Sequence, residues 1–270
     1  MPTYVIAGAS RGIGLEFVRQ LSQDAHNTVV GLARSPKEAT SRYGENLPAN
    51  VTFIEADIVD HQSLKSAATK VESIVGGKLD YLINNGAFIS QLSAFKSLAD
   101  FPDDPDILAE DLTKSFRTNV IGVIQTVNAF VPLLRKGTAK KVLTLSTGLG
   151  SPDFINETEV DVAAPYAISK AAVNMAVAHY NALYKKEGIL FMAISPGYVD
   201  TGNGPDLSDE EALKGAMAMG AKFAKYAPHM KGPIQPDESV SSMLKILGNA
   251  SIEKGDGGSF ISHLGNKQWL

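Results

Sequence analysis

A tyrosine and a lysine stand four positions apart near the start of a long helical stretch; they are Tyr166 and Lys170. Side chains at positions i and i+4 of a helix are neighbours, with Cβ atoms about 5–6 Å apart, so this ammonium can approach the phenol. A free tyrosine has a pKa of about 10, and a nearby positive charge favours the phenolate. The spacing therefore predicts a proton donor whose pKa is lowered by Lys170.

The same pair has an ordinary alternative, which is an exposed aromatic ring beside a solvated lysine. The neighbouring residues are small and leave room for a bound cofactor: Ala167, Ser169, Ala171 and Ala172. We therefore favour the catalytic interpretation of Tyr166 and Lys170.

A glycine-rich turn lies near the amino terminus, between an apolar run at residues 4–7 and helical spacing at residues 15–21. Its glycines, Gly8, Gly12 and Gly14, let the backbone turn sharply and approach a ligand closely. The helix that follows presents free N–H groups to phosphate oxygens. The spacing differs from G-x-G-x-x-G, and such turns also occur as plain connections. Together with the Tyr–Lys pair, the turn favours a dinucleotide site.

Composition and charge exclude several classes of protein. The 270 residues carry a net charge of −4 and no cluster of lysine and arginine, which argues against nucleic acid and anionic membranes as partners. The absence of cysteine excludes disulfides and thiolate metal sites, and the scattered histidines suggest no metal site. No apolar run reaches the ~20 residues of a membrane span, and no signal peptide precedes the first strand. We expect a soluble, cytoplasmic protein.

Short apolar runs alternate with helical stretches along the whole chain. The runs expected as strands are residues 4–7, 28–33, 51–56, 79–84, 141–146, 189–194 and 258–261. This alternation predicts an α/β fold with a doubly wound, parallel, seven-stranded sheet, the Rossmann fold, and helices on both faces. Its ligand should lie at the carboxyl ends of the strands. We expect one NAD(P)-binding domain over residues 1–270.

Polar residues and glycines at these strand ends complete a pattern. The matching pieces are Gly8/Gly12/Gly14, Asp57, Asn84-Asn85-Gly86-Ala87, Asn119, Ser146-Thr147, Tyr166/Lys170 and Pro196-Gly197-Tyr198-Val199-Asp200-Thr201. In this order they resemble the short-chain dehydrogenase/reductase family over essentially the whole chain. The 18 residues between Thr147 and Tyr166, and the tail at 265–269, are similar to the C-factor-like and fungal ketoreductase branch.

The resemblance implies catalytic roles. Tyr166 would be the acid/base, and Lys170 would modulate its pKa and bind the nicotinamide ribose. Asn119 would interrupt a helix and hold a water that leads to the lysine. The hydroxyl that polarises the carbonyl falls on Thr147, and Ser146 is the alternative.

The residue types of that donor loop leave further possibilities open. Threonine is restricted at χ1, which makes its hydroxyl harder to aim than that of serine. Ser151 is a third candidate, and the hydroxyls could instead cap their own loop.

Charge predicts the cofactor. NAD-selective sites place a carboxylate after the second strand, but this chain has Arg34 there and Arg11 inside the glycine turn. Two guanidiniums suit a 2′-phosphate, although each could also point into water. We expect NADP(H) in preference to NAD(H). The resemblance further implies cofactor contacts from Gly8, Ser10, Gly12, Ile13, Gly14, Asp57, Ile58, Asn84, Gly86, Tyr166, Lys170, Pro196, Gly197, Val199 and Thr201.

The substrate side is expected in two long segments. Residues 202–232 follow the sixth strand, where the family carries a substrate lid, and residues 148–165 form a long loop with Phe154 and Ile155. We predict substrate contacts from these two residues and from Tyr198 and Met217. Helical spacing in the lid also permits Met217 to face the core. The expected substrate is an apolar small-molecule carbonyl or alcohol, such as a medium-sized apolar or aromatic ketone.

These features predict an NADPH-dependent carbonyl reductase that also works as an alcohol dehydrogenase, with Tyr166 as the proton donor. The alternative is a cofactor-binding sensor or scaffold without turnover. Family members usually pair through the helices at residues 106–119 and 120–135, so we expect a homodimer or homotetramer.

Overall fold

The computed structural model describes residues 1–101, 103–202, 204 and 207–270. It forms one parallel sheet of seven strands in the order β3-β2-β1-β4-β5-β6-β7. The strands are β1 (Thr3–Ala7), β2 (Thr28–Ala33), β3 (Val51–Glu55), β4 (Tyr81–Asn84), β5 (Lys141–Leu145), β6 (Leu190–Ser195) and β7 (Phe260–Ser262). The predicted doubly wound fold is confirmed.

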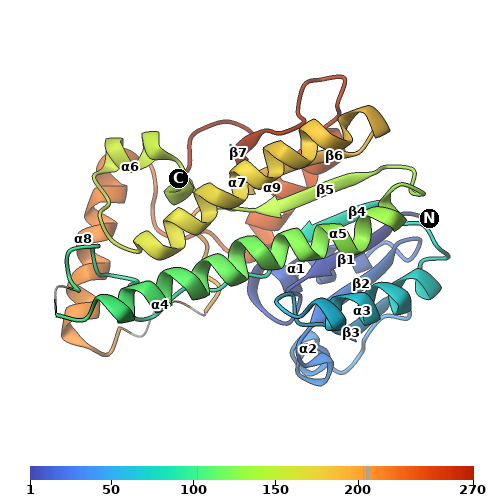
Figure 1. Ribbon diagram of the computed structural model, residues 1–270, viewed down its shortest axis with the longest axis horizontal. Helices are drawn as coiled ribbons and strands as arrows, with labels where there is room; N and C mark the ends of the chain where they lie inside the picture. The colour runs from blue at the N-terminus through green and yellow to red at the C-terminus, as the bar shows by residue number, and fades with distance from the viewer. Residues whose placement is uncertain (102, 203, 205–206) are drawn as a thin grey trace.

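The helices connect these strands on both faces of the sheet (Figure 1). They are α1 (Gly12–Ser22), α2 (Pro36–Tyr43), α3 (His61–Ile74), α4 (Pro105–Phe116), α5 (Gly122–Leu134), α6 (Pro152–Thr158), α7 (Ala164–Tyr184), α8 (Glu210–Tyr226) and α9 (Pro236–Asn249). Three short turns of other helical types are η1 (π, Arg117–Ile121), η2 (3-10, Gly148–Gly150) and η3 (3-10, Lys185–Glu187).

Two large apolar clusters hold the helices to the sheet. One joins α3, α5 and α7 to one face, with Phe130 and Val177 among its buried side chains. The other joins α1 and α9 to the opposite face, with Phe17 and Met243. The strands read as apolar runs because both of their faces are covered, as in β6, where every residue is buried.

A smaller cluster, here called the outer cluster, lies beyond the carboxyl edge of the sheet. Its buried members are Phe154, Val160, Phe223 and Trp269. It joins α6, α8 and the carboxyl-terminal tail, which lie together at one end of the molecule (Figure 1). The amino terminus lies at the other end.

The segment between residues 148 and 165 is not the plain loop that we expected. It begins with η2 and continues into α6, whose start has clear signals. Ser151 caps the helix by accepting a hydrogen bond from Phe154 N at 3.4 Å. Pro152 occupies the first turn, and the carboxylate of Asp153 lies there too, near the positive end of the helix dipole. These three residues were readable in the sequence.

Strand boundaries differ from the predictions by one or two residues. The fourth strand begins at Tyr81 rather than residue 79, because Leu79 N donates to Leu133 O at the end of α5. The carboxylate of Asp80 accepts hydrogen bonds from the backbone of Thr3, Thr138 and Ala139. These hydrogen bonds connect the residues before β4 to neighbouring segments, so the β-sheet pairing of β4 starts only at Tyr81.

Candidate active site

The glycine turn after β1 lies where the strand order reverses, because β1 is paired with β2 on one side and β4 on the other. A Cβ added to Gly8 would stand 2.4 Å from Gly86 Cα, and one added to Gly14 would stand 2.1 Å from Gly8 O. Gly8 and Gly12 also have φ of +80° and +53°, a region that favours glycine. The turns after β1 and β4 are therefore packed backbone against backbone.

Asn85 fastens this contact, a role that the sequence analysis did not assign to it. Its Nδ2 donates to Gly8 O at 2.7 Å. The adjacent Asn84 is buried; its Nδ2 donates to Thr144 Oγ1 at 3.2 Å, and its Oδ1 has no hydrogen-bond partner among the described residues. The repeated asparagine after β4 was the available signal for Asn85.

The first turn of α1 fits a phosphate group. Its N-cap residue, Arg11, has extended backbone and offers no side-chain cap, and the first turn contains no acidic residue. The free N–H groups of this turn and the helix dipole favour an anion there. Ser10 and Ile13 are half-buried on either side of Gly12, while Arg11 is exposed.

The residues predicted at the adenosine end follow β2 and β3. Arg34 comes directly after β2 and is exposed. Asp57 is half-buried, and its Oδ1 accepts from Val59 N at 3.1 Å. Ile58 lies against Gly86 and Gly122, since a Cβ on either glycine would be 3.1 Å from its side chain. The structure thus sets Asp57 and Ile58 beside the turn after β4.

Tyr166 and Lys170 lie in the first two turns of α7. Lys170 is 2% exposed, its Nζ donates to Leu145 O at 2.7 Å, and this nitrogen lies 5.8 Å from the centre of the Tyr166 ring. Burial lowers the pKa of Lys170 to about 8. Lys170 therefore meets the end of β5, where the hydroxyl residues begin, and the Tyr166 ring lies near its ammonium.

The predicted lowering of the Tyr166 pKa is wrong for this arrangement, because burial raises the pKa of that phenol. Lys170 directs its ammonium to the carbonyl of Leu145, and desolvation of the phenol raises the pKa of Tyr166. The sequence spacing gave the proximity of the two residues but not the depth at which they lie.

The candidate donor loop, Ser146 to Ser151, packs directly on α7. A Cβ added to Gly150 would lie 3.1 Å from the backbone of Lys170 and Ala171. Ser146 is 3% exposed and its Oγ has no hydrogen-bond partner among the described residues, whereas Thr147 Oγ1 accepts from Leu149 N at 3.3 Å. Thr147 thus caps η2, as one alternative foresaw, and Ser146 Oγ is a buried donor without a partner.

Asn119 lies within the π-helical turn η1, so the expected interruption of the helix is present. It is fully buried; its Oδ1 accepts from Phe88 N at 2.7 Å, and its Nδ2 donates to Phe88 O and to Ser169 Oγ, both at 2.9 Å. Ser169 in turn donates to Tyr166 O at 2.6 Å. Ser169 connects Asn119 to the tyrosine backbone, and the sequence analysis did not assign it this role.

The residues after β6 are held by the start of α9. Pro196 O accepts from Ser239 Oγ at 2.7 Å, and Gly197 has a φ of +86°. Val199 forms a parallel bridge with Ile234, which closes the base of the predicted lid. Thr201 is half-buried. Residues 203, 205 and 206 of the lid lie outside the described residues.

The predicted substrate residues divide into two groups. Phe154 is 2% exposed in the outer cluster, with its ring centre 4.9 Å from that of Tyr226, and Ile155 packs against the same cluster. The structure therefore corrects Phe154 from a substrate-lining residue to a core residue. Met217 and Tyr198 are exposed, and Met217 does not face the core.

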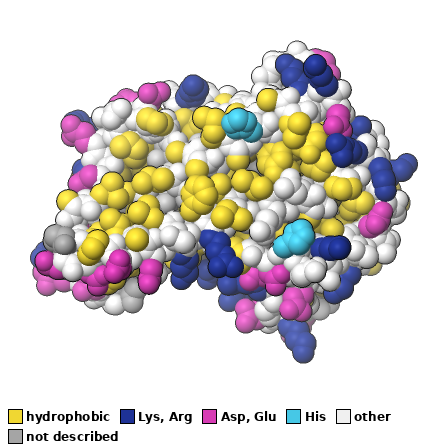
Figure 2. All heavy atoms as spheres, in the orientation of Figure 1, with side chains coloured by type: hydrophobic (Ala, Val, Ile, Leu, Met, Phe, Trp, Pro, Cys, Tyr) yellow, Lys and Arg dark blue, Asp and Glu magenta, His cyan; other side chains and the backbone are white. Residues whose placement is uncertain are grey.

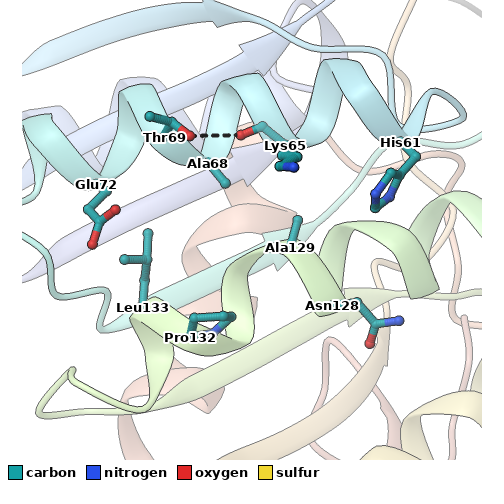
Figure 3. Close-up of a pocket in the computed structure, with 9 residues that line it drawn as sticks. All are labelled: His61, Lys65, Ala68, Thr69, Glu72, Asn128, Ala129, Pro132 and Leu133. Carbon is teal, nitrogen blue, oxygen red and sulfur yellow. Dashed lines mark hydrogen bonds between the residues drawn. The ribbon is translucent and has the colours of Figure 1, made fainter.

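A surface groove between α3 and α5 contains none of the predicted site residues (Figure 3). His61, Lys65 and Asn128 line it, and in Figure 3 they lie along the two facing helices. In the described residues, no group of three or more His, Cys, Asp or Glu side chains is placed to hold a metal ion. None of the helices in the described ranges is both long and apolar enough to cross a membrane.

Comparison with known proteins identifies the family of the chain. The family model described as short chain dehydrogenase matches residues 2–212. The short chain dehydrogenase virK of Hypocrea virens and the short-chain dehydrogenase/reductase AacuF of Aspergillus aculeatus are each 47% identical over 272 residues, covering 100% of both chains. The chain belongs to the short-chain dehydrogenase/reductase family and is an oxidoreductase of that family.

Solved structures give the same fold. An NADPH-bound carbonyl reductase from chicken fatty liver matches with a TM-score of 0.75 and 27% identity, covering 98% of each chain. The carbonyl reductase Sniffer of D. melanogaster matches with a TM-score of 0.77 and 19% identity, again covering 98% of each chain. The first of these carries the cofactor that the arginines of this chain predict.

Proposed function

We propose that this protein is an NADPH-dependent carbonyl reductase that also oxidises alcohols. The observation that carries the proposal is the hydrogen bond from Lys170 Nζ to Leu145 O, because it brings the Tyr–Lys pair of α7 to the hydroxyl loop after β5. A proton donor, a cation and a hydroxyl are the groups that a reacting carbonyl needs. A carbonyl reductase of known structure that shares 27% identity and binds NADPH adds support.

The chain's own residues would act as follows. NADP(H), when bound, supplies the hydride for the carbonyl carbon. Tyr166 donates a proton to the carbonyl oxygen, and Ser146 or Thr147 donates a hydrogen bond to the same oxygen. Lys170 keeps a positive charge near the phenol and binds the ribose. Asn119 holds a water that returns a proton toward Lys170.

Cofactor binding is proposed along the carboxyl edge of β1 to β4. The first turn of α1 would bind the pyrophosphate, and Arg11 and Arg34 would bind the 2′-phosphate of NADP(H). The orphaned Oδ1 of Asn84 fits a polar group of the bound ligand. The absence of a carboxylate directly after β2 supports NADP(H) over NAD(H).

The cofactor preference is tested with Arg34→Ala. The change should raise the KM for NADPH about tenfold, because one charge-assisted hydrogen bond is lost, and leave the KM for NADH unchanged. Arg42→Ala, which removes another exposed arginine of the same region, is the matched control. A wild-type preference for NADH would reject the arginine argument.

The proposed substrate is an apolar small-molecule ketone, of medium size or aromatic, or the corresponding alcohol. Tyr198 and Met217 are exposed near the base and along the helix of the lid, where they would contact it. We treat residues 1–270 as one domain with 202–232 as this lid. NADPH oxidation measured against a panel of aliphatic and aromatic ketones tests the proposal, and turnover with none of them would contradict it.

The second candidate function is a sensor or scaffold that binds NADP(H) without turnover. The burial-raised pKa of Tyr166 is the observation that favours it, since a donor of high pKa transfers its proton less readily. Tight NADPH binding with no oxidation by any ketone would support this alternative.

We also propose that two or four copies associate in the cytoplasm. Exposed apolar side chains gather on the face that α4, α5 and α7 form, as the yellow band in Figure 2 shows. They are Ile107, Phe116, Ile121, Ile168, Met175 and Leu183. Light scattering should give the mass of a dimer or tetramer, and Ile168→Glu should reduce it to that of a monomer.

A further inference from the structure

The carboxyl-terminal tail packs against two segments of the candidate active site, the turn after β6 and the loop after β5. It leaves β7 at His263, whose N donates to Ser195 O at 2.8 Å. The ring of His263 lies against the turn after β6, because a Cβ added to Gly197 would be 2.6 Å from its Cε1. The tail then turns at Asn266, which accepts from Ser262 N at 2.7 Å, and reaches Trp269.

Trp269 lies against the loop that carries the candidate donor. A Cβ added to Gly148 would stand 2.6 Å from Trp269 Cβ and 2.9 Å from its Cγ, so the side chain of Trp269 lies directly against the backbone of Gly148. The indole is 5% exposed and stacks on Phe260, with ring centres 4.4 Å apart. Gly148 immediately follows Thr147 and stands two positions after Ser146.

Hydrogen bonds to other elements hold the two ends of the loop. Ser146 N donates to Ile194 O of β6 at 2.7 Å, and Asn174 Nδ2 of α7 donates to Gly150 O at 3.5 Å. The bonds within the loop are local: Gly150 N donates to Thr147 O and Ser151 N donates to Gly148 O, both at 2.9 Å. Between the two ends, the side chain of Trp269 packs on Gly148.

We propose that Trp269 is a positioning residue that holds the backbone of Gly148 and thereby aims the hydroxyl of Ser146 or Thr147 at the substrate carbonyl. This inference rests on the proposed reductase function. Hydrogen-bond donors act on developing charge only when they are fixed beforehand, and residues behind them provide that rigidity. The indole also belongs to the outer cluster with Phe223, so the same side chain links the donor loop to the helix of the lid.

Catalysis gives the first test. Removal of Trp269 and Leu270 should lower kcat roughly 10–100-fold, because a misplacement of about 1 Å has effects of this size, while the Kd for NADPH stays within about twofold. Trp269→Phe, which keeps an aromatic ring against Phe260, should restore most of kcat. A purely structural role would instead lower kcat and NADPH binding together, in proportion to the fraction of folded protein. Unchanged kcat in the truncated protein would overturn the proposal.

Gly148→Ala approaches the same contact from the other side. Because its Cβ would overlap Trp269, this variant should lower kcat on its own, and it should add little to the truncation when the two are combined. Gly248→Ala is the matched control, since nothing lies within 4 Å of the added Cβ. Additive losses would show that Gly148 and Trp269 act independently and would contradict the inference.

Two readouts do not need turnover. Trp269 is the only tryptophan of the chain, so its emission reports on this contact alone; it should shift to longer wavelength in Gly148→Ala and stay unchanged in Gly248→Ala. Truncation should also speed hydrogen exchange at the amides of residues 148–151. If wild-type protein turns over no ketone, the reductase proposal fails, and these two measurements still decide whether Trp269 holds the loop. Unchanged emission and unchanged exchange would overturn it.

Discussion

The cofactor side and the substrate side of the site are built differently. On the cofactor side, α1 begins five residues after β1 ends, and the turns after β1 and β4 touch through glycine backbones. On the substrate side, long excursions follow β4, β5 and β6, and those after β5 and β6 pack on the outer cluster. The first construction leaves almost no freedom in sequence, whereas the second can change with the substrate.

This contrast separates the chemistry from the choice of substrate. Tyr166 and Lys170 stand between the two sides, on a helix that is buried against β5 and β6. The residues proposed to recognise the carbonyl lie on segments whose packing depends on a few large side chains. Changes on one side should therefore leave the other side largely intact.

The largest expected effect comes from breaking the chemistry while both sides stay folded. Tyr166→Phe should lower kcat by roughly 10²–10⁴-fold, the usual contribution of a general acid, with little change in the Kd for NADPH. Single-turnover kinetics and NADPH titration measure the two quantities. A variant that keeps a substantial rate would show that another group supplies the proton.

Phe154→Ala should break the substrate side alone. Loss of this buried ring should lower the free energy of unfolding by about 3–5 kcal/mol, since a cavity remains among Phe223, Tyr226 and Trp269. Denaturant titration measures the loss. NADPH should still bind with nearly wild-type affinity when the protein is folded, and weakened NADPH binding in folded protein would contradict the separation.

Lys170→Met tests the helix between the two sides, through the pH dependence of the free energy of unfolding. The pKa of Lys170 is about 8 in the folded protein, below its unfolded value of about 10.5. Burial of the charged ammonium therefore lowers the free energy of unfolding by its full amount below pH 8, and this loss disappears above about pH 10.5, where the lysine is neutral in both states. That destabilisation is worth about 3 kcal/mol, and loss of the bond to Leu145 offsets about 1 kcal/mol of it. Lys170→Met should thus be about 2 kcal/mol more stable at pH 7, inactive, and no more stable than wild type at pH 10.5. A destabilised variant at pH 7 would show that the charge is well solvated.

Gly14→Ala should break the cofactor side alone, with the smallest expected loss of stability. Its Cβ would overlap Gly8 O and Asn85 Nδ2, so overpacking should cost about 1–3 kcal/mol and abolish tight NADPH binding. Gly220→Ala, at a helical glycine with no atom within 4 Å of the added Cβ, is the control. The emission of Trp269 should not change, because the outer cluster is remote in the fold; a change would mean that the two sides are coupled.

The sequence was most informative where local rules dominate. The alternation of apolar runs predicted the sheet and its helices, and the order of motifs predicted which residues meet at its carboxyl edge. The roles of Asn85 and Ser169 were not predicted, because each depends on a partner far away in the sequence. Asn85 binds Gly8, 77 residues away, and Ser169 binds Asn119, 50 residues away. Such contacts have no periodicity that a single sequence displays.

The substrate side was predicted less well for the same physical reason. Phe154 looked like a pocket residue, but its burial depends on Phe223 and Trp269, which arrive from distant segments. The pKa of Tyr166 was predicted in the wrong direction, because spacing reveals a neighbouring charge and not the desolvation of the phenol. Depth within a fold depends on all the elements that pack there.

The most direct test follows a deuterium label. Reduction of a ketone with NADPH that carries deuterium at both C4 positions of the nicotinamide should place one deuterium on the carbinol carbon of the product, and Tyr166→Phe should suppress its formation. Mass spectrometry of the alcohol gives the answer. Tight binding of NADPH with no labelled alcohol from any ketone would contradict the account and leave a nucleotide-binding protein without this chemistry.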